Sequence, residues 1–143
     1  MVEKYNFELI VSDGGSTDNT INIAKKYVDK LVLKTKQERQ TISEGRNDGA
    51  KVAVGETLVF LNADCMPQNV ENFLDFIYTW NKDAEKYSAV ACKVKSLEQE
   101  ELIRDKLFYF FINNYVKFLN LIGVGMGRGE CQIIRKKIFN KLN

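Results

Sequence analysis

The chain has 143 residues, a net charge of +2 and no histidine. Its 45% apolar and 28% charged residues are ordinary for a globular domain, which excludes disordered and fibrous proteins. The balanced charge gives no support for a nucleic-acid partner. Because histidine is absent, Ser-His-Asp and Cys-His nucleophile systems and histidine-ligated metals are excluded. Acid–base or metal chemistry must therefore rest on carboxylates.

The length predicts one domain over residues 1–143. Its three cysteines, Cys65, Cys92 and Cys131, form no C-x-x-C pair, and the N-terminal residues do not resemble a secretory signal. No apolar run is long enough to span a bilayer. We therefore expect reduced thiols and a cytoplasmic protein, at most peripheral at the inner face of the membrane.

Strand-like and helix-like segments alternate along the chain. We expect strands over 7–11, 31–33, 57–61, 88–95 and 131–135. Helices are expected from residue 18, over 45–54, from residue 69, over 98–122 and over 136–142, with a surface loop over 34–44. This alternation predicts an α/β sandwich with a mainly parallel sheet, in which ligands bind beyond the carboxyl ends of the strands.

The helix expected over 98–122 is long, amphipathic and rich in aromatic residues. Two interpretations of its apolar face stay open. It packs in the core or in a dimer, or it rests on a membrane surface or meets a lipid-linked acceptor, with Lys106 and Lys117 toward the headgroups.

Two strand ends carry residues suited to binding a nucleotide. Ser12 to Asp18 combines glycines, hydroxyls and two carboxylates, although a tight turn with a helix cap explains the same pattern. Asn62-Ala63-Asp64 follows the most apolar strand, and its oxygen atoms suit Mg²⁺ or Mn²⁺, although turn Asp residues are common. Arg46 stands at an expected helix start, where it either contacts a diphosphate or lies on the surface.

Three segments together resemble the family 2 glycosyltransferases of the GT-A fold. They are Glu8 to Thr20, Gly45 to Ala50 and Leu58 to Asp64, and the tail from Gly127 to Phe139 is also similar. The resemblance implies a GT-A-like three-layer sandwich. It also implies an inverting transfer of sugar from a UDP- or GDP-linked donor to an acceptor, with a divalent metal.

The resemblance also implies roles for particular residues. Asp13 would read the nucleotide base with Gly14, Gly15 and Ser16 beside it, and Arg46 would lie near the base and diphosphate. Asn62 and Asp64 occupy the family's D-x-D element, in which Asp64 would bind the metal.

The sequence departs from the family at three places. Asn62 replaces a carboxylate, the family's first strand has no counterpart before Phe7, and the chain stops before the motif that carries the catalytic base. We therefore expect a chain truncated at both ends. The strands at 7–11 and 57–61 then either pair directly or receive a strand from a partner, so a homo-oligomer is expected. Glu130 is a weak substitute for the base.

Because of these departures, a second class of protein stays open for this chain. The chain is either a glycosyltransferase, or its donor-binding part, or a non-catalytic module that acts through self-association or a membrane complex. A nucleotidyltransferase of related topology is disfavoured, because the glycine-rich run at 123–128 lies at the wrong end of the chain.

Overall fold

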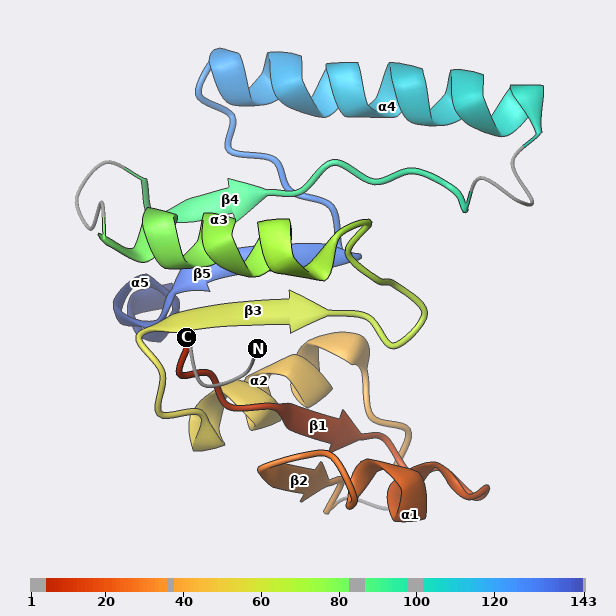
Figure 1. The fold of residues 1–143 in the computed structure, drawn as a ribbon, viewed down its shortest axis with the longest axis vertical. Helices are drawn as coiled ribbons and strands as arrows, with labels where there is room; N and C mark the ends of the chain where they lie inside the picture. Colours follow the sequence, from red (N-terminus) through yellow and green to blue (C-terminus); the bar gives the residue numbers. More distant parts are fainter. Residues whose placement is uncertain (1–4, 36–37, 83–86, 98–101, 143) are drawn as a thin grey trace.

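The computed structural model describes residues 5–35, 38–82, 87–97 and 102–142. In chain order the described elements are β1 (Ile10–Asp13), α1 (Thr20–Ala24), β2 (Lys30–Leu33), α2 (Ile42–Val52), β3 (Thr57–Leu61), α3 (Val70–Lys82), β4 (Ala89–Ala91), α4 (Ile103–Leu121), β5 (Cys131–Arg135) and α5 (Lys136–Leu142) (Figure 1). The expected α/β class is confirmed.

The described strands form two separate sheets. β1 and β2 pair in parallel, with Ile10 opposite Lys30 and Asp13 opposite Leu33. In the second sheet β5 lies between β3 and β4 and runs antiparallel to both. The expectation of a mainly parallel sheet is therefore wrong for these strands. The physical reason is that β5 returns after α4 in the opposite direction and becomes the central strand (Figure 1).

The strands β1 and β3 do not pair with each other. Among the described strands, β1 pairs only with β2, and β3 pairs only with β5. The alternative in which these two strands pair directly is therefore wrong. A strand supplied by a partner, and with it the three-layer GT-A arrangement, stays a prediction.

Alternate residues of β5 face opposite sides of its sheet, as the strand pleat requires. Ile133, only 1% exposed, and Cys131 pack in a cluster with Trp80 of α3. Ile134 packs on the other cluster, which contains Leu58 of β3 and Ala50 of α2. Helix α3 thus covers one face of the sheet, while α2 packs on the other.

Glu8 ties the smaller sheet to the end of α2. Its carboxylate accepts hydrogen bonds from the backbone N–H groups of Val54 and Gly55 and pairs with Lys30 at 2.7 Å. The bond from Lys30, helped by the two backbone donors, lowers the pKa of Glu8 to about 2 against the opposing effect of burial. An ionised Glu8 therefore holds β2 and the α2–β3 turn together at neutral pH.

Several elements differ from the expected boundaries. The strand expected over 88–95 is shorter, since β4 ends at Ala91, and the strand expected over 7–11 begins at Ile10. Helix α2 begins three residues earlier than expected, because Thr41 and Glu44 form a reciprocal capping box. Helix α1 ends at Ala24, so the expected helical face does not include Tyr27, which is 73% exposed. The start of the helix expected over 98–122 falls at 98–101, outside the described residues, and α4 is described from Ile103.

Helix α4 lies along one side of the molecule, beyond β4 (Figure 1). Asn113 fixes it through two bonds to the backbone of Val94, at 2.7 and 3.2 Å. Val116 is buried on the same side. Most of the side chains expected to face a core are exposed instead, although Ile112 and Leu119 are half-buried. An outer stripe of apolar residues is more than half exposed, namely Ile103, Leu107, Phe110, Phe111, Phe118 and, next to them, Leu121. The interpretation of this stripe as a core face is therefore wrong for the described chain.

None of the described helices, α4 included, combines the length and the apolar character that a bilayer span needs.

The packing around β5 predicts the cost of trimming its central residue. Ile133→Ala leaves a cavity between α3 and the sheet, and we expect it to lower the free energy of unfolding by about 2–5 kcal/mol. Urea unfolding followed by circular dichroism measures this. Ile42→Ala is the matched control, because Ile42 is 71% exposed. An equal effect of the two variants would contradict the described core.

Candidate functional site

The loop after β1 closes on the carboxylate of Asp13. One carboxylate oxygen accepts the backbone N–H groups of Gly15 and Ser16, both at 2.8 Å. The other accepts the Ser16 hydroxyl. Asp13 is buried. In the described structure the carboxylate of Asp13 therefore stabilises the tight turn that follows it, which is one of the two interpretations of this segment.

The environment of this loop keeps Asp13 ionised. The Ser16 hydroxyl, together with backbone N–H groups and the Lys34 ammonium, holds the pKa of Asp13 below its usual value despite burial. Gly15 has a φ of +104°, and a side chain there would lie 2.5 Å from Cε of Lys34. Only glycine fits at this position without moving Lys34.

Helix α2 packs closely against the end of β1. A Cβ added at Gly45 would lie 3.6 Å from the Ser12 hydroxyl, and one at Gly49 would lie 3.8 Å from Cβ of Ser12. The hydroxyl of Ser12 is buried and has no hydrogen-bond partner among the described residues. A buried polar atom without a partner is costly, and this one lies beside the Asp13 loop.

Arg46, the next residue of α2, reaches the second sheet. Its guanidinium donates to the side-chain oxygen of Asn62 at 2.8 Å and to that of Gln132 at 3.3 Å. It also donates to the carbonyl oxygen of Gly129. The backbone N–H of Asn62 in turn donates to the carbonyl of Glu130 at 3.1 Å. One side chain thus joins α2, the end of β3, the start of β5 and the preceding loop.

Asp64 stands just beyond this network and is exposed. Its carboxylate accepts a hydrogen bond from the Cys65 thiol at 3.5 Å. The negative charge of Asp64 acts to raise the pKa of both Cys65 and Glu130. No cluster of three or more metal-ligating side chains occurs in the described part of the chain. Asp64 therefore offers a single carboxylate, a donor that would suit an ion whose remaining ligands are water and phosphate oxygens.

Glu130 and Arg128 form a close ion pair with two hydrogen bonds. Burial acts to raise the pKa of Glu130, but its own backbone N–H and Arg128 outweigh burial, so the pKa is lowered. A general base needs a pKa near the working pH, so this pairing disfavours Glu130 in that role. Arg128 stacks on Tyr109 of α4 at 5.3 Å, and its Nη1 is buried without a partner among the described residues.

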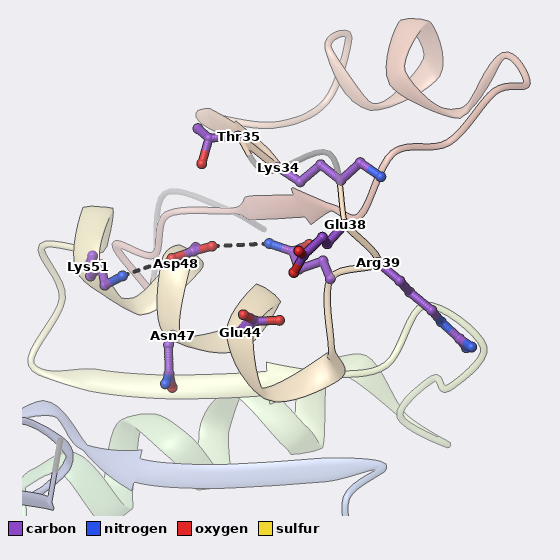
Figure 2. Close-up of a pocket in the computed structure, with 9 residues that line it drawn as sticks. Lys34, Thr35, Glu38, Arg39, Glu44, Asn47, Asp48 and Lys51 are labelled. Carbon is purple, nitrogen blue, oxygen red and sulfur yellow. Dashed lines mark hydrogen bonds and ion pairs between the residues drawn. The ribbon is translucent and has the colours of Figure 1, made fainter.

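A separate polar pocket of about 290 Å³ lies between α2 and the segment after β2 (Figure 2). Asp48 accepts from Gln40 and pairs with Lys51 inside it, at 3.0 and 2.8 Å. Three acidic and three basic residues line it, and Arg39 points away from its interior. Acidic and basic side chains are thus mixed along the lining of this pocket.

The predicted site residues fall into two groups on either side of α2. Asp13, Gly14, Gly15 and Ser16 share the loop after β1, while Arg46, Asn62 and Asp64 gather at the carboxyl end of β3. Sequence reasoning missed Arg128 and Gln132, which complete the second group. The spacing of the tail signals a strand at 131–135, but nothing in the sequence states that β5 lies beside β3.

Comparison with known proteins identifies the family of the chain. The model of the family "Glycosyl transferase family 2" matches residues 2–142. The chain therefore belongs to glycosyl transferase family 2. No solved structure gave a significant match.

Curated relatives match the chain over shorter segments. "Validoxylamine A glucosyltransferase" of Streptomyces hygroscopicus subsp. jinggangensis is 35% identical over 74 residues, 48% of this chain and 18% of that protein. "Glycosyltransferase AglE" of Haloferax volcanii is 36% identical over 67 residues, 45% of this chain and 22% of that protein. A "PGL/p-HBAD biosynthesis glycosyltransferase" of Mycobacterium bovis is 37% identical over 62 residues, 41% and 24% of the two chains. The matched segments thus span less than a quarter of each relative.

The bonds of Asp13 predict a pH-dependent contribution to stability. Because folding lowers its pKa, this contribution is present above the unfolded pKa of about 3.9 and is lost as the pH falls through the folded value. We expect Asp13→Asn to cost about 1–3 kcal/mol at neutral pH and progressively less below about pH 4. Urea unfolding across this range measures the difference, with Glu71→Gln as an exposed control. A cost that does not change with pH would contradict the ionised carboxylate.

Proposed function

We propose that this domain binds a nucleotide-diphosphate sugar, UDP- or GDP-linked, and transfers the sugar to an acceptor with inversion, with the help of Mg²⁺ or Mn²⁺. The meeting of three chain segments around α2 carries the proposal. The end of β1, just before the Asp13 loop, contacts one side of α2 through Ser12, and Arg46 joins α2 to the end of β3. Family membership supports sugar transfer in general.

The proposed donor site has one region for the base and ribose and another for the diphosphate. In the proposal the base and ribose lie at the Asp13 loop, where Asp13 accepts a base N–H and Gly14, Gly15 and Ser16 allow close approach. The open acceptor capacity of Asp13 supports this, because one of its oxygens accepts only the Ser16 hydroxyl among the described residues. The unpartnered Ser12 hydroxyl nearby offers a further polar contact.

The diphosphate lies, in the same proposal, between Arg46 and Asp64. Arg46 keeps Asn62 in place, and the unpartnered Nη1 of Arg128 gives an anion a buried donor. Asp64 holds the metal, whose positive charge stabilises the leaving diphosphate. Asn62 accepts a hydrogen bond from Arg46, and an amide oxygen is sufficient for this contact. A second carboxylate at this position would repel the phosphates of the donor.

The reaction also needs a base that deprotonates the acceptor hydroxyl. Glu130 remains a weak candidate, because its ion pair with Arg128 would have to open first. The alternative is a non-catalytic module that binds through its surfaces. Product formation from a sugar nucleotide distinguishes the two, whereas nucleotide binding alone tests the donor site.

The donor site predicts metal-dependent nucleotide binding. Calorimetric titration with UDP, and then with GDP, should give binding of at least one nucleotide in Mg²⁺ and a large loss in excess chelator. Asp64→Asn should weaken binding in Mg²⁺ by about tenfold or more, equivalent to about 1.4 kcal/mol, because a ligand charge is removed.

Glu71→Gln, which removes an exposed carboxylate at the start of α3, is the matched control and should bind like the wild type. Binding of neither nucleotide by folded protein would favour the non-catalytic module. A nucleotide affinity that changes neither with removal of the metal nor with Asp64→Asn would overturn the proposal that Asp64 binds the metal.

We also propose that α4 brings the domain to an anionic membrane surface, where a lipid-linked acceptor would be within reach. Phe110, Phe118 and their outward neighbours are exposed along the whole helix. Between Ile103 and Leu121 the cations Arg104, Lys106 and Lys117 outnumber the single acid, Asp105. Asp105 is half-buried and caps the helix through the Leu102 N–H.

This combination of charge and exposure suits an interfacial helix. Pairing two copies of α4 would bring cations together, which disfavours a second copy as the occupant of this stripe. The expected homo-oligomer stays a prediction, and its interface would then lie elsewhere.

The membrane proposal predicts lipid-selective sedimentation. The protein should sediment with phosphatidylglycerol vesicles, bind phosphatidylcholine vesicles weakly, and lose binding as salt screens the cations. Phe110→Asp with Phe118→Asp should reduce binding at least about tenfold. Tyr27→Asp is the control, because Tyr27 is at least as exposed as these phenylalanines but lies outside α4. The wild-type protein would contradict the proposal if it did not bind vesicles and instead self-associated in a way that the same two phenylalanine substitutions abolish. The stripe would then be a dimer interface.

A further inference from the structure

Cys92 and Cys131 face each other across two antiparallel strands. The β4–β5 register pairs Val90 with Ile133 and ends with Ala91 opposite Gln132. Cys92 follows Ala91, and Cys131 precedes Gln132, so both lie directly beyond the last pair. Directly opposite residues in such a ladder project to the same face of the sheet. Opposite residues in antiparallel ladders have Cα atoms about 4.5–5.5 Å apart, within the range of about 4.4–6.8 Å that a disulfide spans. The side chains of Cys92 and Cys131 are hydrogen-bonded to each other and pack in one cluster.

The surroundings give the two thiols different roles. Both belong to the apolar cluster between α3 and the sheet, where Cys131 is buried and Cys92 is partly exposed. Hydrogen bonding with the Cys131 side chain lowers the pKa of Cys92 to about 7, while the same contact and burial raise the pKa of Cys131. Cys92 is thus the thiol that a reagent can reach, and Cys131 is the thiol placed behind it.

We propose that Cys92 and Cys131 form a dithiol site for thiol–disulfide exchange with small-molecule disulfides, and that exchange closes a Cys92–Cys131 disulfide. This site lies on the face of β5 opposite the residues that meet Arg46, and it is independent of the proposed sugar transfer.

The exchange proceeds in two balanced steps. The Cys92 thiolate attacks one sulfur of a disulfide R–S–S–R, the S–S bond breaks, and one RS⁻ leaves. Cys131 then loses its proton to solvent and attacks the Cys92 sulfur, which releases the second RS⁻. The protein dithiol loses two electrons, and the small-molecule disulfide is reduced to two thiols.

Cys65 is the natural comparison within the chain. It is partly exposed like Cys92, but burial of its sulfur and the neighbouring Asp64 raise its pKa. It therefore keeps its proton at neutral pH and should react more slowly.

Reduced protein treated with oxidised glutathione, then alkylated and analysed by mass spectrometry, tests the proposal. We expect an intact mass lower by two hydrogen atoms before alkylation, a linked Cys92–Cys131 peptide, an alkylated Cys65, and full reversal by dithiothreitol. Cys65→Ser should behave like the wild type. Cys92→Ser should form no internal disulfide.

Cys131→Ala should stop at a glutathione adduct on Cys92. If this buried substitution prevents folding, the wild-type peptide map and Cys92→Ser still decide. A persistent adduct on wild-type Cys92, a disulfide that includes Cys65, or no reaction of the folded protein would overturn the proposal.

Discussion

One guanidinium, that of Arg46, joins helix α2 to the carboxyl end of β3, to β5 and to the loop before β5. Its bonds to Asn62, Gln132 and Gly129 come from one residue of α2, and Gly45 beside it lets the same helix approach β1. The two sheets share no strand pairing among the described strands. Helix α2 therefore positions the two halves of the candidate site relative to each other, with the Asp13 loop on one side and Asp64 on the other.

The two faces of strand β5 contact different parts of the molecule. Gln132 and the backbone of Glu130 belong to the Arg46 network, while Cys131 and Ile133 pack under α3. This alternation follows from the strand pleat. It explains why the proposed nucleotide site and the proposed thiol site can lie within the same few residues without sharing side chains.

Local patterns predicted local structure well. The bounds of β3, β5 and α5 match the expectation, because each is a short segment with clear flanking signals. The early start of α2 was also readable, since Thr41 and Glu44 stand at capping-box spacing. The direction of β5, the separation of β1 from β3 and the outward stripe of α4 depend on packing between distant segments. Periodicity shows that α4 has an apolar face, but it does not show what that face contacts.

The bond between Arg46 and Asn62 holds the candidate site together, and a double-mutant cycle measures how much free energy it contributes. Arg46→Met, Asn62→Ala and the double variant would be unfolded in urea, and the coupling free energy taken from the four unfolding free energies. The structure predicts a favourable coupling of about 1.5–3 kcal/mol, the range of a hydrogen bond to a charged group. A coupling near zero, with all four proteins folded, would contradict the account.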